Sequence, residues 1–289
     1  MASVSRRGDL TDKQWARLRR WVPAPKTRGR RISRPRRTLF NGVAWRVRVG
    51  SPWRDVPEAY GPWPTVYWLF RTWQRDGIWA LMVKMILALL DKTGALTWTV
   101  SVDSTSVRAH QAAAGARHRP VPGEPADHAL GRSRGGWTTK IHLAADASQT
   151  VMALKLTAGQ RGDSPHFQPV LDQIAVPRLG PGRPRKRPRR VLADKAYSSK
   201  ANRRYLRKRS IQAVIPEKKD HRRNRIAKGR HGGRPPAFDA EAYKERNTVE
   251  RAIGRLKRFR AVATRYDKLA VRYQATIHIA IILDWKPNS

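Results

Sequence analysis

Apolar residues recur at helical spacing near the start of the chain. In the stretch LTDKQWARLRRWV, Trp15, Leu18 and Val22 lie three or four positions apart, and Thr11 precedes them at a position that suits a helix N-cap. The same periodicity predicts three further helices, over residues 38–50, 65–77 and 78–91. The beginning of the chain is therefore predicted to be entirely helical.

The predicted helix over 65–77 carries Arg71 and Arg75 and follows a turn region rich in proline and glycine. A helix in this setting, with basic side chains, is compatible with docking in the major groove of DNA. Most of the eleven tryptophans precede residue 80 and recur at helical spacing among leucine and valine, so we expect them in a core. Residues 1–93 are predicted to form a helical, helix-turn-helix-like DNA-end-binding domain. A purely structural helical cap is the alternative.

The pattern then changes from helices to strands. In TWTVSVDSTSV, Val100 and Val102 alternate with Ser101 and Asp103, as in a half-buried strand. Further strands are predicted in TTKIHLAAD, TVMALKLTAG, VLAD and IQAVIP, and helices in SPHFQPVLDQIAV, over 198–209 and over about 239–260. Three strands followed by alternating helices and strands predict an α/β, ribonuclease-H-like (retroviral-integrase-like) domain over residues 94–289.

Composition adds an extreme positive charge. The 61 basic residues exceed the 21 acidic ones by 40, and the sequence pI is near 11.7. A compact chain with this much self-repulsion needs a polyanion as its partner, and nucleic acid is the obvious one. The basic runs at 183–190 and 218–234 are too dense for an ordinary solvated face, and we expect them to track phosphates and to order on DNA.

A membrane is the other common polyanion, but the sequence does not favour one. The longest apolar stretch, 78–90, contains Lys84 and is shorter than the roughly 20 residues that a span requires. The first ten residues do not resemble a secretory signal. The absence of cysteine excludes disulfides, cysteine-based zinc sites and thiol catalysis. We therefore expect a cytoplasmic, nucleoid-associated protein that works on DNA or RNA.

Two aspartates end predicted strands, namely Asp103 and Asp194. Either one alone is more readily explained as a loop or turn residue. The stretch YKERNTVERAIGRLK adds a third element, because it predicts one helix with a polar stripe of Tyr243, Arg246, Glu250 and Lys257. The bland alternative is a solvated face in which Arg246 and Glu250 form an ordinary i,i+4 ion pair.

Three carboxylates near DNA suit one chemistry, the in-line attack on a phosphodiester assisted by two metal ions. Magnesium prefers hard oxygen ligands and needs few of them from the protein. The sequence therefore predicts a site for two Mg²⁺ ions, for which Mn²⁺ would substitute. Basic side chains beside the carboxylates would hold the DNA backbone.

These motifs resemble those of bacterial insertion-sequence transposases of the three-carboxylate (DDE) kind. The stretches VDSTSV and ADKAYSS and the Tyr-x2-Arg-x3-Glu-x6-Lys string resemble signatures of the insertion-sequence four and five superfamily. GGWTTKIHLA, TAGQRGDS and the opening LTDKQWARL with SPWRDVP resemble stretches of the fifth-element group. The resemblance runs over nearly the whole chain.

The resemblance implies that Asp103, Asp194 and Glu250 form the catalytic, metal-binding triad, and that Tyr243, Arg246 and Lys257 position DNA phosphates. It also implies cleavage at the terminal inverted repeats of an element and joining of the freed 3′ ends to target DNA. Because two ends must be held together, we expect a homodimer on double-stranded DNA. The alternatives are a decayed or domesticated DNA-binding protein and a structure-selective nuclease.

Other polar residues are weaker candidates. Lys195 and Tyr197 follow Asp194 closely and are expected to touch DNA, although a structural role for the tyrosine is about as plausible. Asp146 lies in the turn DASQ, where aspartate is common for backbone reasons. Asp163 is interpreted as a helix cap and Asp172 as a surface residue. The histidines have no cysteine partners and no tight ligand spacing, so zinc is not expected.

Overall fold

The computed structural model describes residues 8–23, 34–116 and 121–285. The chain divides into two compact units. Residues 1–86, 107–128 and 255–289 contribute to the first unit, and residues 87–106 and 129–254 form the second. No helix in the described ranges has the length and apolar character needed to cross a membrane. The boundary at residue 93 between a helical and a catalytic domain stays a prediction.

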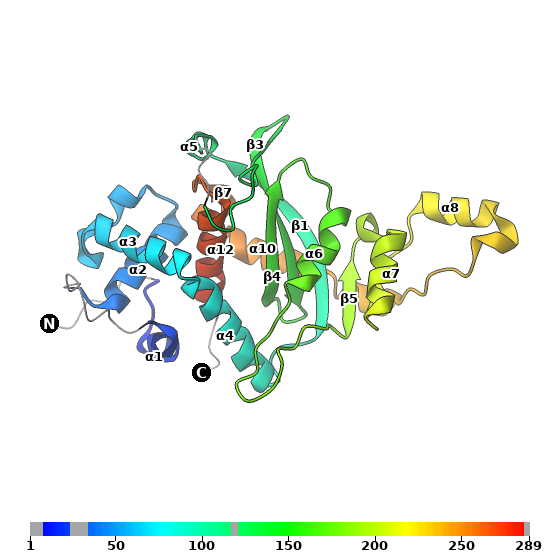
Figure 1. Ribbon diagram of the computed structural model, residues 1–289, viewed down its shortest axis with the longest axis horizontal. Coiled ribbons are helices and arrows are strands. Elements are labelled where there is room, and N and C mark those ends of the chain that lie inside the picture. The colour runs from blue at the N-terminus through cyan, green and yellow to red at the C-terminus, as the bar shows by residue number, and fades with distance from the viewer. Residues whose placement is uncertain (1–7, 24–33, 117–120, 286–289) are drawn as a thin grey trace. The chain divides into compact units, whose positions relative to one another are not determined.

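Helices dominate the first unit (Figure 1). They are α1 Asp12–Leu18, α2 Arg36–Val49, α3 Trp63–Arg75, α11 Arg260–Ala263, α12 Ala270–Asp284 and the first part of α4 Ile78–Lys92. The side chain of Thr11 accepts a hydrogen bond from the N–H of Gln14, and Gln14 returns one to the backbone of Thr11. Gly50 ends α2 in the left-handed region at φ 74°. The predicted helices over this part of the chain are confirmed.

An aromatic cluster fills the core of this unit. The rings of Phe40 and Trp79 lie 5.5 Å apart, and those of Trp73 and Trp79 lie 4.9 Å apart. All three side chains are buried, as the helical spacing of the tryptophans predicted. By contrast, Trp63 and Trp68 on α3 are exposed to solvent.

The second unit is built on a mixed sheet. Its strands are β1 Thr99–Ala109, β2 Gly131–Ser133, β3 Gly136–Asp146, β4 Val151–Ala158, β5 Arg190–Ala193 and β6 Gln212–Val214. The sheet order is β3-β1-β5-β6, with β2 and β4 antiparallel to β3. Strands β1, β5 and β6 run parallel to one another. The short β7, Thr264–Arg265, pairs with the last residues of β1.

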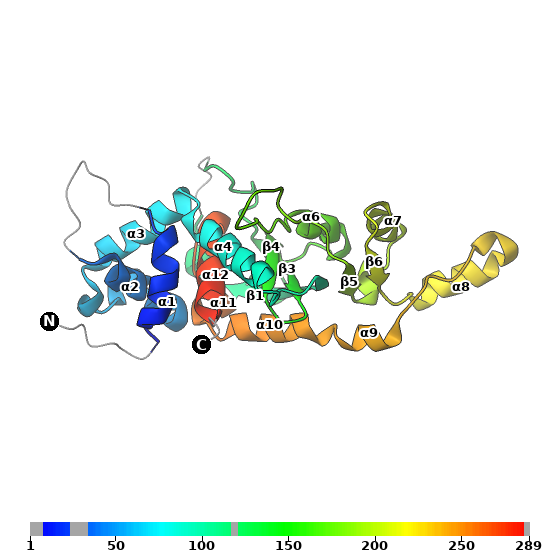
Figure 2. The same cartoon turned by 90° about the horizontal axis from the view of Figure 1, so that it is seen from below.

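Helices cover both faces of this sheet. Figure 2 shows α6 Phe167–Asp172 and α7 Lys200–Lys208 on one side and α9 Ala240–Lys244 and α10 Asn247–Lys257 on the other. Three strands in a meander, followed by parallel strands joined through helices, make this a ribonuclease-H-like α/β fold. The predicted fold class is confirmed.

Three segments differ from the sequence prediction. Between residues 108 and 136, where the sequence pattern predicted no helix, lie α5 Gln111–Ala114 and β2. The basic segment 218–234 was expected to order on DNA, but within the protein itself it forms α8 Lys219–Ala227 and a short 3-10 turn. Because α8 is exposed along most of its length, it lacks the apolar periodicity from which a helix is predicted.

The helix expected over 239–260 is interrupted. Asp239 caps α9 by accepting a hydrogen bond from the N–H of Ala242. The N–H groups of Arg246 and Thr248 then bond to carbonyls three residues earlier, those of Tyr243 and Glu245. A tighter turn of this kind separates α9 from α10. The helical spacing had assumed one regular helix for Tyr243, Arg246 and Glu250. The turn means that Tyr243 and Arg246 do not share a regular helix with Glu250.

Candidate active site

Two aspartates lie side by side at the ends of paired parallel strands. The register of β1 and β5 matches Ser101 with Leu192 and Val102 with Ala193. Asp103 follows Val102 and Asp194 follows Ala193, so both carboxylates lie at the same edge of the sheet. The apolar residues before them are fully buried, which fixes the strand ends against the core.

Local backbone contacts hold both carboxylates. Asp103 Oδ1 accepts a hydrogen bond of 2.7 Å from the N–H of Ser104. The side chain of Asp194 accepts from the N–H of Lys195, which begins a 3-10 turn. Lys195 itself is exposed beside Asp194. These bonds orient the two carboxylates without neutralising their charge.

Glu250 reaches the same edge from the helix that covers the sheet. It stands in the first turn of α10, whose buried residues Val249 and Ala252 pack against the core. Thr248 Oγ1 lies 3.3 Å from Ser101 Oγ, which ties the start of α10 to β1. The glutamate side chain is half exposed, at 48%.

Arg246 joins two of the three carboxylates. Its Nη1 donates to Asp103 Oδ2 at 3.2 Å, and its Nη2 pairs with Glu250 Oε1. The ring of Tyr243 lies 5.9 Å from the guanidinium, in cation–π geometry. The expected i,i+4 pair between Arg246 and Glu250 is therefore present, and it extends to a residue 143 positions earlier in the chain.

Burial and neighbouring charges shift the pKa values of two residues at this site, Asp103 and Tyr243. Burial raises the pKa of Asp103, and the charge of Glu250 raises it further against the lowering effect of Arg246. Burial raises the pKa of the Tyr243 phenol, and the charges of Asp103, Asp194 and Glu250 add to the rise. All three carboxylates thus act on one tyrosine, although they come from three separate elements.

Among the described residues, no three histidine, aspartate or glutamate side chains are arranged as a ready metal site. Arg246 takes up oxygens of Asp103 and Glu250. The donor set nevertheless fits Mg²⁺, because it consists of hard carboxylate oxygens at one sheet edge, partly exposed and repelling one another. The residues are therefore chemically suited to hold Mg²⁺. In this structure the guanidinium of Arg246 supplies the positive charge beside two of the carboxylates.

The other sequence candidates lie in different surroundings. Lys257 ends α10 and is grouped with the first unit, as are Arg71 and Arg75 on α3. Arg71 is partly buried and donates to Gln74 Oε1 at 2.6 Å, whereas Arg75 is exposed. Within their own unit, these two arginines lie on an accessible side of α3.

Tyr197 is buried, with its ring 5.5 Å from that of Phe167, and burial strongly raises the pKa of its phenol. This placement favours the structural alternative for that residue. Asp172 is exposed and pairs with Arg209 at 3.1 Å, so its interpretation as a surface residue is confirmed.

Asp163 stands at the N-cap position of the 3-10 turn Ser164–His166, as predicted. Its side chain makes no capping bond. It accepts instead from Ser104 Oγ at 2.7 Å and pairs with Lys140 Nζ at 3.0 Å. Burial opposes its ionisation, but the hydrogen bonds from Ser104 and Lys140 prevail and lower the pKa of Asp163. The Asp163 carboxylate therefore contacts Ser104, the residue that directly follows Asp103. Folding brings them together, since they are far apart in the sequence.

The comparisons with known proteins agree with this geometry. Residues 94–285, about two thirds of the chain, match the model of the family described as "Transposase DDE domain". The chain belongs to this family. Residues 10–83 match a second model, described as "Putative transposase of IS4/5 family". The resemblance to insertion-sequence transposases is thereby confirmed, and so is the enzyme class, a DDE transposase that cleaves DNA and transfers strands.

Individual relatives cover parts of the transposase. This chain is 28% identical over 148 residues to a putative transposase for the insertion sequence element IS6501 of Brucella ovis. The match covers 51% of this chain and 98% of the relative. The chain is 40% identical over 109 residues to the uncharacterized protein y4sN of Sinorhizobium fredii, covering 37% and 82%. Among solved structures, the Mos1 strand transfer complex is similar with a TM-score of 0.28 and 14% identity, covering 83% of this chain and 80% of that chain.

Proposed function

We propose that this transposase cuts DNA at the ends of an insertion sequence and joins the 3′ ends to a target, with Asp103, Asp194 and Glu250 as the metal-binding triad. The observation that carries the proposal is that Arg246 bridges Asp103 and Glu250, while the register of β1 and β5 brings Asp194 to the same sheet edge as Asp103. Family membership supplies the reaction class, and the strand register supports this sheet edge as its site.

In this proposal the three carboxylates hold two Mg²⁺ ions, with Mn²⁺ as a substitute. When bound, such ions activate the attacking oxygen and stabilise the leaving oxygen of a phosphodiester. Asp103 and Asp194 are already oriented by backbone N–H groups, so little reorganisation is needed at the strand ends. Arg246, once released from Asp103 and Glu250, has the planar fork that binds a phosphate through two oxygens.

DNA contacts outside the triad belong to the same proposal. Tyr243 and the exposed Lys195 flank the carboxylates and would contact the cleaved strand. Lys257, Arg71 and Arg75 would also contact the duplex, and the helical region would recognise the terminal inverted repeats. We further propose that two copies act together on paired DNA ends, and that the protein works in the cytoplasm at the nucleoid.

The decisive experiment is cleavage of a labelled duplex that carries the element's own end sequence, in Mg²⁺ or Mn²⁺. Wild-type protein is expected to nick at the element boundary, and Asp103→Asn is expected to bind the duplex without nicking it. Binding without nicking by the wild-type protein would instead identify a decayed or repurposed DNA-binding protein. Nicking at random positions would identify a nuclease that lacks end recognition.

A further inference from the structure

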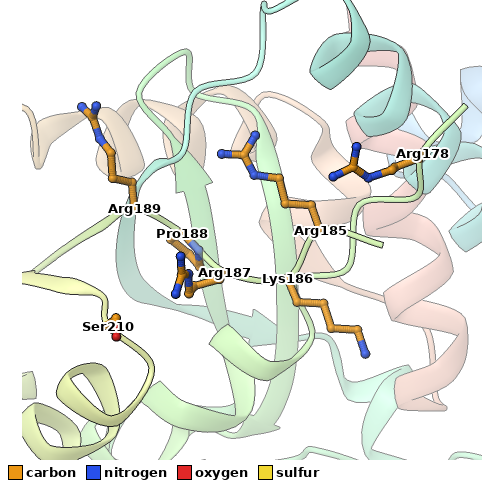
Figure 3. Close-up of a pocket in the computed structure, with 7 residues that line it drawn as sticks. All are labelled: Arg178, Arg185, Lys186, Arg187, Pro188, Arg189 and Ser210. Carbon is orange, nitrogen blue, oxygen red and sulfur yellow. The ribbon is translucent and has the colours of Figure 1, made fainter. Parts of the chain in front are cut away.

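A strongly basic pocket lies in the second unit, away from the triad. It has a volume of about 390 Å³ and is lined by Arg178, Arg185, Lys186, Arg187, Pro188, Arg189 and Ser210. Figure 3 shows that its side chains come from the connection between α6 and β5, apart from Ser210 at the start of the loop before β6. None of the described residues that line this pocket carries a carboxylate.

The backbone of this basic connection is fixed by long-range bonds. Val176 and Arg185 exchange two backbone hydrogen bonds of 2.9 Å. The N–H of Arg189 donates to the carbonyl of Trp98 at 2.9 Å, and Arg209 donates to the carbonyl of Lys186 at 3.0 Å. The segment was expected to order only on DNA, but these bonds shape it within the protein itself.

One of the lining cations, Arg185, has partners within the protein. Arg185 lies over the ring of Trp98, 3.9 Å from its centroid, and is 3.4 Å from Asp91. Within the described part of the chain, the other four have no carboxylate partner, and all are exposed: Arg178, Lys186, Arg187 and Arg189. Their combined positive charge favours a bound anion.

The pocket and the proposed active site lie at opposite ends of one strand. Arg189 directly precedes β5 and Asp194 directly follows it. Five residues of extended chain span about 16 Å, so one bound phosphate cannot serve both places. Along a duplex, that distance corresponds to about five base pairs.

We propose that this pocket binds phosphates of a duplex DNA backbone at a distance from the bond that is cut. Arginine side chains bind phosphate oxygens in pairs, and their exposure here leaves room for a continuous polymer. The fixed backbone means that little ordering entropy opposes binding. The choice of duplex DNA as the ligand rests on the proposed function, whereas the anion preference rests on the pocket alone.

The test measures the salt dependence of binding to a 30-base-pair duplex of unrelated sequence, without divalent metal. The variant Arg187→Gln/Arg189→Gln removes two pocket charges. A matched control, Lys92→Gln/Arg204→Gln, removes two exposed charges elsewhere in the second unit. Thermal unfolding of all three proteins establishes that the variants fold.

Loss of two phosphate contacts lowers the slope of log K against log salt by about 1.8. From 50 to 200 mM salt, wild-type protein is therefore expected to lose about tenfold more affinity than the pocket variant. The control variant should keep the wild-type slope. Equal slopes for the two variants would overturn the proposal.

Binding of inorganic phosphate at the pocket with an unchanged DNA slope would also overturn the proposal, since it would assign the pocket to a small free anion. The measurement does not depend on cleavage. A protein that shows the slope change but cuts no DNA would retain this pocket assignment and lose the proposed function.

Discussion

Arg246 donates to Oδ2 of Asp103 at 3.2 Å while its other terminal nitrogen pairs with Glu250. One side chain therefore bridges two carboxylates that lie on different elements, a strand end and a helix. The bridge opposes the burial and the repulsion from Glu250 that raise the pKa of Asp103. It also means that a phosphate and the two carboxylates compete for the same guanidinium.

Replacing Arg246 by alanine should weaken DNA binding and lower the salt-dependence slope by about one unit, because one phosphate contact is lost. Arg246→Lys should restore most of the slope, since it keeps the charge, but not the two-point contact. Arg251→Ala is the matched control, because Arg251 is exposed on α10, the helix that directly follows Arg246. A slope that is the same for Arg246→Ala and the control would make Arg246 a structural residue.

Neutralising any member of the triad should stop cleavage while leaving DNA binding intact or stronger. The expected variants are Asp103→Asn, Asp194→Asn and Glu250→Gln. Metal assistance contributes several kcal/mol to such reactions, so cleavage should fall by about a thousandfold or more. Asp172→Asn serves as a control, because that carboxylate is exposed and pairs only at the surface. Wild-type cleavage by any one triad variant would exclude its residue from the metal site.

The sequence predicted the two strand-end aspartates because alternation of buried valines marks β1, and a short apolar run marks β5. It placed Glu250 on a helix, since Val249, Ala252 and Leu256 repeat at helical spacing. These signals are local, and local patterns survive folding. Helical spacing could not reveal the turn before α10, because a shift from i+4 to i+3 bonding leaves the apolar pattern unchanged.

Long-range contacts account for the rest of the differences. Asp163 lies 59 residues from Ser104, and nothing near it in the sequence announces their hydrogen bond. The basic pocket is similarly hidden, because Arg185 is held by Trp98 and Asp91, which precede it by more than 80 residues. A dense basic run alone does not distinguish a shaped pocket from a solvated linker.

Asp146 should matter for stability rather than for cleavage. Its buried carboxylate accepts from the N–H of Thr97 at 2.9 Å and from that of Thr150 at 2.8 Å. Asp146→Ala leaves both donors unsatisfied, and we expect a loss of roughly 3 kcal/mol in the free energy of unfolding. Asp172→Ala, at an exposed ion pair, should cost about 0–1 kcal/mol. Urea unfolding measures both, and equal losses would contradict the assignment.

The second unit should lose stability in mild acid because of His142. This imidazole is buried, its Nε2 bonds with Thr157 Oγ1 at 2.9 Å, and its Nδ1 has no hydrogen-bond partner among the described residues. Burial and the neighbouring His166 lower the pKa of His142 to about 3. Asp163, 3.9 Å away, opposes that shift, and Lys140 and Lys155 add to it.

The sign of the effect follows from linkage. In the unfolded chain His142 takes up a proton near pH 6.5, whereas in the folded protein it stays neutral until about pH 3. Its contribution is therefore complete above pH 6.5 and is lost as the pH falls towards 3. Between pH 7 and pH 4 the wild-type protein should lose about 3 kcal/mol more than His142→Gln, which cannot be protonated. Unfolding free energies of both proteins at the two pH values measure this difference, and a parallel decline would show that His142 is already charged or exposed when folded.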